Sequence, residues 1–78
     1  MTVNYFDYDE LRAKALAPEA TKEDRLNLWY WFDEYGMEYW DGESYDMDDG
    51  LRLFPHYSLI EDQRGEIVDL ELVDAVIR

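Results

Sequence analysis

Apolar side chains recur at helical spacing in two segments of the N-terminal half of the chain. In the first segment, Tyr8, Leu11 and Ala15 follow one another at intervals of three and four residues, which predicts a helix over 8–16. Pro18 disfavours helical geometry at the residue before it, so we expect this helix to end before the proline.

Capping residues mark the limits of both helices. At the start of the first helix, Asp7 is followed three residues later by Glu10, which is the spacing of a capping box. Thr21 and Asp24 repeat that spacing at the start of the second helix. Gly36 is typical of a helix C-terminus, so we expect the second helix to end just before it.

The second helix, over 22–35, is apolar around most of its circumference. Its broad apolar face carries Leu28, Trp29, Phe32 and Tyr35. Tyr30 and Trp31 fall on either side of the narrow polar stripe opposite that face. A helix with apolar residues this far round is either covered on several sides or exposes Tyr30 or Trp31 for contact with a partner.

From residue 37 onward the pattern changes to short strands separated by turns. Strand-like runs occupy 37–40, 43–47, 51–60 and 66–72. The turns between them fall at Asp41-Gly42, Asp48-Asp49-Gly50 and Glu61 to Gly65. Pro55 interrupts the third run, which confines that strand to a sheet edge or a bulge.

The last strand-like run alternates between apolar and acidic residues. One face carries Val68, Leu70 and Leu72, and the other carries Asp69 and Glu71. Residues 72–77 fit either a strand or a short terminal helix. We therefore expect a single acidic α+β domain over 1–78, in which two N-terminal helices pack on a small antiparallel sheet of three to four strands.

Composition adds aromatic bulk and charge to this picture. The 78 residues include three Trp, seven Tyr and three Phe, whose rings can stabilise a small core that has no cysteine to cross-link it. Without disulfides, the cytoplasm is the expected compartment. Twenty Asp and Glu against seven Lys and Arg give a formal net charge of −13. Because 17% of the residues are aromatic, we expect a folded domain whose acidity either maintains solubility or addresses a cationic partner.

No residue pattern indicates catalysis, a metal site or a cofactor. The single histidine, His56, has no cysteine, second histidine or serine-nucleophile motif to work with. So short a chain is also expected to leave little volume for a ligand pocket of about 300 Å³ or more. When Gly50 is aligned with the sixth position of an EF-hand loop, Tyr45, Met47 and His56 stand where three main ligands should be. Phosphate-binding glycine motifs are absent as well.

Membrane and nucleic-acid binding are disfavoured too. No run approaches the roughly 20 apolar residues of a membrane span. The first five residues contain neither a basic region nor an apolar core, so no signal peptide is expected. Seven cations scattered among twenty acids cannot form the basic patch that direct nucleic-acid binding needs.

The acids are concentrated in the seventeen residues from Asp33 to Asp49, which contain eight acids and no Lys or Arg. Such a run spans a helix end, a strand and two turns, so its charges are expected to be held on a scaffold. Aromatic residues between the acids suit a surface that both attracts a basic protein and packs against it. The expected partner-binding residues are Asp33, Glu34, Glu38, Tyr39, Trp40, Asp41, Glu43, Tyr45, Asp46, Asp48 and Asp49.

Size, charge, aromatic content and absence of cysteine together resemble the small DNA-mimic inhibitors encoded by phages and other mobile elements, of the anti-CRISPR, anti-restriction and uracil-DNA glycosylase inhibitor types. The stretch from Tyr39 to Pro55 also resembles short phage and mobile-element proteins. The resemblance is one of composition and assigns no role to a single residue. It implies a non-enzymatic inhibitor, monomeric or a small homo-oligomer, in the host cytoplasm. Its partner would be a basic DNA-binding protein or CRISPR effector complex whose target DNA it keeps out.

A second class of function stays open. An acidic structural or adaptor domain of a phage or mobile element would bind its partner through exposed aromatic residues, with the acids serving only solubility. Its binding would be insensitive to salt and would depend on Tyr30, Trp31 or Trp40. A DNA mimic would instead lose binding as salt rises past the physiological range, where the Debye length falls below about 8 Å.

Overall fold

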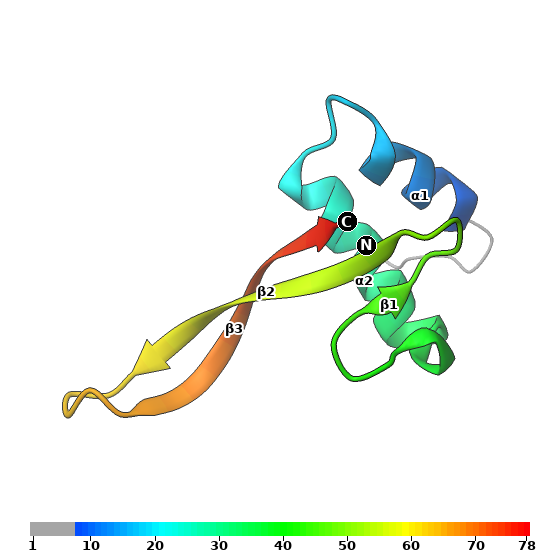
Figure 1. Ribbon diagram of the computed structural model, residues 1–78. Coiled ribbons are helices and arrows are strands. Elements are labelled where there is room, and N and C mark those ends of the chain that lie inside the picture. Colours follow the sequence, from blue (N-terminus) through cyan, green and yellow to red (C-terminus); the bar gives the residue numbers. More distant parts are fainter. Residues whose placement is uncertain (1–7) are drawn as a thin grey trace.

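The computed structural model describes residues 8–78, and Asp7, the expected cap of the first helix, lies outside them. Helix α1 spans Tyr8–Leu16 and helix α2 spans Lys22–Tyr35, which confirms both predicted helices. The helices pack against each other, and the chain then continues into a sheet (Figure 1). None of the helices in the described part of the chain has the length and apolar character to cross a membrane.

The two ends of α2 are fixed by local contacts. Thr21 Oγ1 accepts a hydrogen bond from the Asp24 backbone N–H at 3.2 Å, and Asp24 Oδ2 accepts one from the Thr21 N–H at 3.0 Å, so the predicted capping box is confirmed. At the other end, the Gly36 N–H donates to the Phe32 carbonyl at 2.8 Å. Glycine fits here because of close packing, since a Cβ at position 36 would lie 2.6 Å from Phe32 Cδ1.

The strand predicted over 37–40 is wrong. The chain forms a turn of 3₁₀ helix there, η2, at Met37–Tyr39. The backbone N–H groups of Tyr39 and Trp40 donate to carbonyls three residues earlier, at 2.9 and 3.1 Å. Of the predicted strand, only its last residue pairs as expected, since Trp40 forms an isolated antiparallel bridge with Tyr45.

Three antiparallel strands form the sheet in the order β1-β2-β3. Their bounds are Tyr45–Asp46 for β1, Arg52–Glu61 for β2 and Ile67–Ile77 for β3. Residues 72–77, ambiguous from the pattern, are therefore strand. β1 is shorter than the predicted run over 43–47 because the Asp41 carboxylate accepts the N–H groups of Glu43 and Ser44 and forms a turn there.

Pro55 lies inside β2, opposite Ala75 of β3. β1 pairs with only the first two residues of β2, so at the proline β2 has a neighbour on one side alone. The edge position predicted for Pro55 is thus confirmed, and a bulge follows between His56 and Tyr57.

The core lies where α2 meets the sheet. Its buried apolar residues are Ala15, Leu28, Trp29, Trp31, Phe32, Tyr45, Met47, Leu53 and Ala75. α2 contributes four of them, and Leu53 and Ala75 mark the part of β2 and β3 that the helices cover. The predicted class, two helices packed on a small antiparallel sheet, is confirmed.

Beyond the core, β2 and β3 continue as a two-stranded arm, residues 57–72, that projects away from the helices (Figure 1). Tyr57 pairs with Leu72 and Leu59 pairs with Leu70, so these side chains share one face of the ribbon. That apolar face is the one predicted from alternation, yet it lies outside the core: Leu59 is 55% exposed and Val68 60%. The helices are too short to reach it.

Candidate functional site

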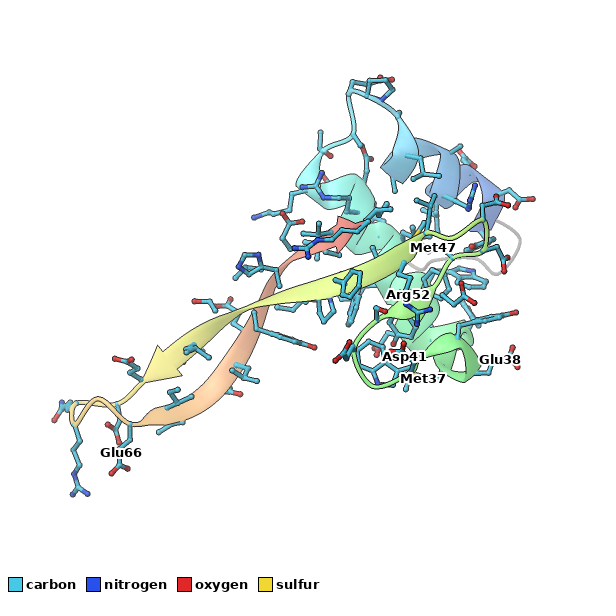
Figure 2. The ribbon with its side chains drawn as sticks, in the orientation of Figure 1. Met37, Glu38, Asp41, Met47, Arg52 and Glu66 are labelled. Atoms are coloured by element: carbon cyan, nitrogen blue, oxygen red, sulfur yellow. The ribbon has the colours of Figure 1, made fainter. Side chains whose placement is uncertain are left out.

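All eight acids of residues 33–49, which we call the acidic segment, are exposed. They extend from the last turn of α2 through η2 and β1 to the loop before β2. This part of the chain lies at the opposite end of the molecule from the tip of the arm, as the positions of Glu38, Asp41 and Glu66 in Figure 2 show. The structure therefore brings the predicted acids together on one end of the fold.

Buried side chains hold the acidic segment against the core. Tyr45 and Met47 are buried and alternate with the exposed Asp46 and Asp48. The buried Ser44 hydroxyl accepts a hydrogen bond from Arg52 Nε at 2.6 Å. The carboxylates consequently project from a backbone that is fixed from beneath.

The acidic segment lacks cations in sequence, but the fold brings two arginines to it. Arg52 Nη2 lies 2.5 Å from Asp41 Oδ2, and Arg12 Nη2 of α1 lies 3.3 Å from Asp49 Oδ2. Among the described residues, the other six acids of the segment take part in no ion pair. Three quarters of these carboxylates thus keep an uncompensated charge.

Asp41 has a structural task in addition to its charge. Its Oδ1 accepts hydrogen bonds from the N–H groups of Glu43 and Ser44, at 2.9 and 3.0 Å, and closes the turn around Gly42. These two backbone hydrogen bonds, aided by the nearby Arg52 guanidinium, lower the pKa of Asp41 below its ordinary value. Asp41 is therefore firmly ionised and is less suited than its neighbours to contact a partner.

The loop after β1 presents its acids in an unusual backbone conformation. Asp48 and Asp49 both have positive φ angles, 68° and 55°, a left-handed conformation that aspartate tolerates better than most residues. The Asp48 N–H donates to Asp46 Oδ1 at 3.0 Å, and the Leu51 N–H donates to the Asp48 carbonyl at 3.0 Å. The first bond holds the Asp46 carboxylate in place, and the second fixes the backbone from which Asp48 and Asp49 project.

Of the aromatic residues expected at the partner surface, only Tyr39 is exposed, at 42%. Trp40 is half-buried, edge-on against Trp29. Tyr45 is 2% exposed and stacks on Phe32 with ring centroids 4.9 Å apart. The expectation that Tyr45 contacts a partner is therefore wrong: it is a core residue, and the alternation of acid and aromatic side chains there is that of a strand with one buried face.

The two aromatic residues beside the polar stripe of α2 have different environments. Tyr30 is 50% exposed, whereas Trp31 is 7% exposed and packs on Tyr8 of α1 with ring centroids 4.4 Å apart. Both outcomes anticipated for this helix therefore occur, since it is covered on several sides and also exposes Tyr30. Trp31 has no surface to offer a large partner.

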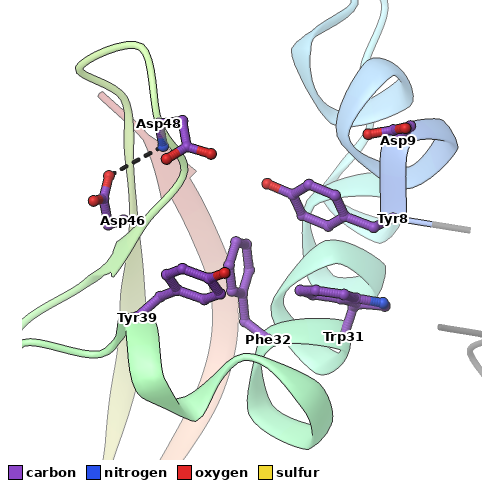
Figure 3. Close-up of a pocket in the computed structure, with 7 residues that line it drawn as sticks. All are labelled: Tyr8, Asp9, Trp31, Phe32, Tyr39, Asp46 and Asp48. Atoms are coloured by element: carbon purple, nitrogen blue, oxygen red, sulfur yellow. Dashed lines mark hydrogen bonds between the residues drawn. The ribbon is translucent and has the colours of Figure 1, made fainter. Parts of the chain in front are cut away.

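A pocket of about 350 Å³ opens next to the acidic segment (Figure 3). It is lined by Tyr8, Asp9, Trp31, Phe32, Tyr39, Asp46 and Asp48. The expectation that so short a chain lacks a pocket of this size is wrong, because the cavity forms at a junction of α1, α2, η2 and β1 rather than inside one layer. No sequence signal pointed to it, since its lining comes from three separate stretches of chain.

The single histidine lies away from the acidic segment. His56 is exposed on β2, opposite Asp74 of β3. Over residues 8–78, no three side chains of the His, Cys, Asp and Glu types are grouped so that they could hold a metal ion.

Neither a protein-family model nor a curated protein nor a solved structure matches this chain. The site is therefore interpreted from its own chemistry.

Proposed function

We propose that this protein is a non-enzymatic inhibitor, a DNA mimic of the anti-CRISPR type, which occupies the positively charged DNA-binding surface of a CRISPR effector complex and blocks target DNA. Its place of action would be the host cytoplasm. The observation that carries the proposal is the exposure of all eight acids of the acidic segment on an ordered backbone. The compositional resemblance to DNA-mimic inhibitors agrees with it.

The position of two acids adds to this support. Asp33 and Glu34 lie in the last turn of α2, which has no basic residue. The negative end of the helix dipole disfavours each of them by about 0.3–1 kcal/mol. Charge needed only for solubility could stand anywhere on the surface. Acids at a helix end that disfavours them are better explained by a cationic partner.

Six carboxylates of the acidic segment form no ion pair within residues 8–78, so they can occupy the positions of DNA phosphates in a basic channel. Duplex DNA presents one charge per roughly 1.7 Å of axis, and a DNA-binding channel is lined with lysine and arginine to match it. Carboxylates on the acidic segment are attracted by the same positive field. The field of a chain with net charge −13 also accelerates encounter at low salt.

The test is inhibition of DNA binding by purified CRISPR effector complexes, with the variant Asp46→Asn/Asp48→Asn/Asp49→Asn. Asparagine retains the acceptor that closes the Asp46 turn and tolerates positive φ, so this variant keeps the loop while removing three charges. Reversal to lysine would also remove the turn. We expect inhibition to weaken by at least about tenfold, which corresponds to about 1.4 kcal/mol.

The matched control removes three charges from the arm instead, as Glu61→Gln/Glu66→Gln/Glu71→Gln. These residues are exposed and distant from the acidic segment. We expect the control to inhibit within about twofold of wild type, a difference of about 0.4 kcal/mol. Equal loss in both variants would mean that net charge, not the acidic segment, is responsible, and full inhibition by the loop variant would refute the proposal.

The arm favours a second candidate function, an adaptor or structural domain that binds through apolar contacts. Leu59, Val68 and Leu70 are all more than half exposed on one face of the ribbon. Isolated two-stranded ribbons are marginally stable in water, and uncovered apolar faces are typical of binding surfaces. Tyr30 adds an exposed ring on α2.

The two candidates differ in their response to salt and to mutation. For an adaptor, Leu59→Ser/Leu70→Ser would abolish partner binding, the Asn triple variant would bind normally, and added salt would have little effect. For a DNA mimic, the serine variant would still inhibit and salt would weaken binding. Affinity titrations of both variants at low and high salt separate the candidates.

A further inference from the structure

The pocket beside the acidic segment combines two kinds of wall. Its aromatic wall comes from Tyr8 of α1, Trp31 and Phe32 of α2 and Tyr39 of η2. Its acidic wall comes from Asp46 and Asp48, with Asp9 as a third acid from α1 (Figure 3). Neither Lys nor Arg is among the described residues that line it.

This lining restricts the chemistry of an occupant. An anion would meet three carboxylates, and a neutral apolar molecule would desolvate them without compensation. A cation satisfies both walls, because it is attracted by the faces of aromatic rings and by the carboxylates. Among biological cations, a guanidinium is planar, so it can stack on a ring and donate paired hydrogen bonds to a carboxylate at the same time.

One arginine of the chain already lies beside this loop. Arg12 of α1 pairs with Asp49, with 3.3 Å between Arg12 Nη2 and Asp49 Oδ2. Asp48, the next acid in the loop, takes part in no ion pair within residues 8–78, and neither does Asp46. The loop thus holds one carboxylate with an internal arginine and leaves two facing the pocket.

The volume sets the size of the occupant. At about 350 Å³ the pocket is at the small end of the range for ligand sites, about 300–1,000 Å³. It has room for a single long side chain, with the apolar stem against the exposed ring of Tyr39 and the charged end at the loop.

We propose that the pocket receives one arginine side chain of a protein partner. This inference rests on the proposed function, in which the partner is a basic DNA-binding protein. The net charge attracts that partner at long range, and the pocket adds one specific side-chain contact. One arginine that normally contacts a DNA phosphate would then be bound in the pocket and no longer available to DNA.

The test is a titration of the full-length protein with N-acetyl-arginine amide, followed by the NMR signals of the Trp31 indole and the Tyr39 ring. We expect saturable shifts at these two residues with a Kd on the order of 1–10 mM, as befits one side chain. N-acetyl-citrulline amide has nearly the same shape without the charge and serves as the matched ligand. N-acetyl-lysine amide carries the charge without the planar fork.

Two pairs of variants complete the experiment. Asp48→Asn should raise the Kd for the arginine amide at least threefold, whereas Asp33→Asn, outside the pocket, should leave it within twofold. Tyr39→Leu should abolish the shift of the Trp31 indole, which is the readout that remains in that variant, whereas Tyr30→Leu, on the exposed side of α2, should retain it. Circular dichroism of each variant shows whether the fold is intact, and Asp48→Asn keeps the test valid if Tyr39→Leu unfolds.

The inference is overturned if citrulline binds as well as arginine, if lysine binds equally well, or if shifts spread over the acidic segment without saturating. It is also overturned if Asp33→Asn weakens binding as much as Asp48→Asn. These results do not depend on CRISPR inhibition. If the wild-type protein does not bind the arginine amide but the Asn triple variant loses DNA competition, the proposed function stands and the arginine pocket is refuted. If the wild-type protein binds the arginine amide but does not compete with DNA, the arginine pocket stands and the proposed function is refuted.

Discussion

Arg25 is the residue that most clearly joins the helices to the sheet. Its Nε donates to the Ala75 carbonyl at 2.9 Å, and its guanidinium donates to both carboxylate oxygens of Asp74, at 3.2 and 3.1 Å. Both side chains are only about a quarter exposed. These hydrogen bonds lower the pKa of Asp74 below its ordinary value. A half-buried pair with this geometry contributes more than a surface ion pair.

The pH dependence of stability follows from that lowered pKa. The Asp74 contribution is fully present above the pKa of an unfolded aspartate, about 3.9, and is lost as the pH falls through the lower pKa of the folded state. We therefore expect Asp74→Asn to reduce the free energy of unfolding by about 1–2 kcal/mol at pH 7. The deficit should shrink steadily below about pH 4.

Urea unfolding at pH 7 and pH 2.5 measures this effect. Asp69→Asn on the exposed arm is the control and should be near neutral at both values. A deficit for Asp74→Asn that is the same at both pH values would show that the Arg25 pair does not contribute through its charge.

At the scale of elements, α2 organises the rest of the fold. It supplies four buried side chains to the core, and α1, η2 and the end of β3 all contact it. Its N-terminus follows the usual rules, with a capping box and Glu23 and Asp24 in the first turn. Its C-terminus breaks them, since Asp33 and Glu34 oppose the dipole without a basic neighbour. Proteins depart from such stabilising rules mainly at functional sites, so the unfavourable charges at this end of α2 indicate a functional role.

Glu34→Lys tests this trade-off between stability and function. Lysine suits the negative end of the helix dipole and makes the net charge less negative, so the variant should be more stable by about 0.5–1 kcal/mol. If the acidic segment binds a cationic partner, the same variant should inhibit less well. Thermal unfolding and DNA competition are measured on one preparation.

Glu71→Lys on the arm changes the net charge equally and is the matched control. It should inhibit like the wild type and lack the part of the stabilisation that comes from the dipole. A Glu34→Lys variant that is stabilised and inhibits fully would assign that acid to solubility.

At the scale of the whole molecule, the distribution of charge and apolar surface is polarised. The acidic segment occupies one end and the arm extends from the other, so the molecule measures 44 × 26 × 25 Å along its principal axes. Self-repulsion among twenty acids lowers the stability of the folded state. Attraction to a basic partner has the same electrostatic origin and the opposite sign.

Added salt should therefore have opposite effects on folding and on binding. Raising NaCl from about 0.05 to 0.5 M shortens the Debye length to less than half. We expect the melting temperature to rise, because repulsion is screened, while the affinity for a basic partner falls. A scanning-fluorimetry series and a competition series over the same salt range measure both. Affinity that stays constant while the melting temperature rises would favour the adaptor function.

Sequence patterns alone were enough for the two helices, the turns and the sheet class. Helix limits depend on caps and breakers within a few residues, such as Thr21 with Asp24, and those local signals are complete in the sequence. The same holds for the concentration of acids between Asp33 and Asp49 and for their exposure, because unpaired carboxylates are costly to bury.

Other features depend on which elements meet. Met37–Tyr39 forms a 3₁₀ turn that follows Gly36, whose backbone packs closely on Phe32. Tyr45 is buried because its strand has one face on α2, and Arg12 and Arg52 reach the acidic segment only through the fold. The alternation of apolar and acidic residues predicted that the arm has an apolar face. Whether that face is covered depends on the lengths and positions of the helices, which leave it exposed. Long-range contacts of this kind place the aromatic wall and the acidic wall around one pocket, since residues 8, 31 and 48 become neighbours only once the helices and strands have packed.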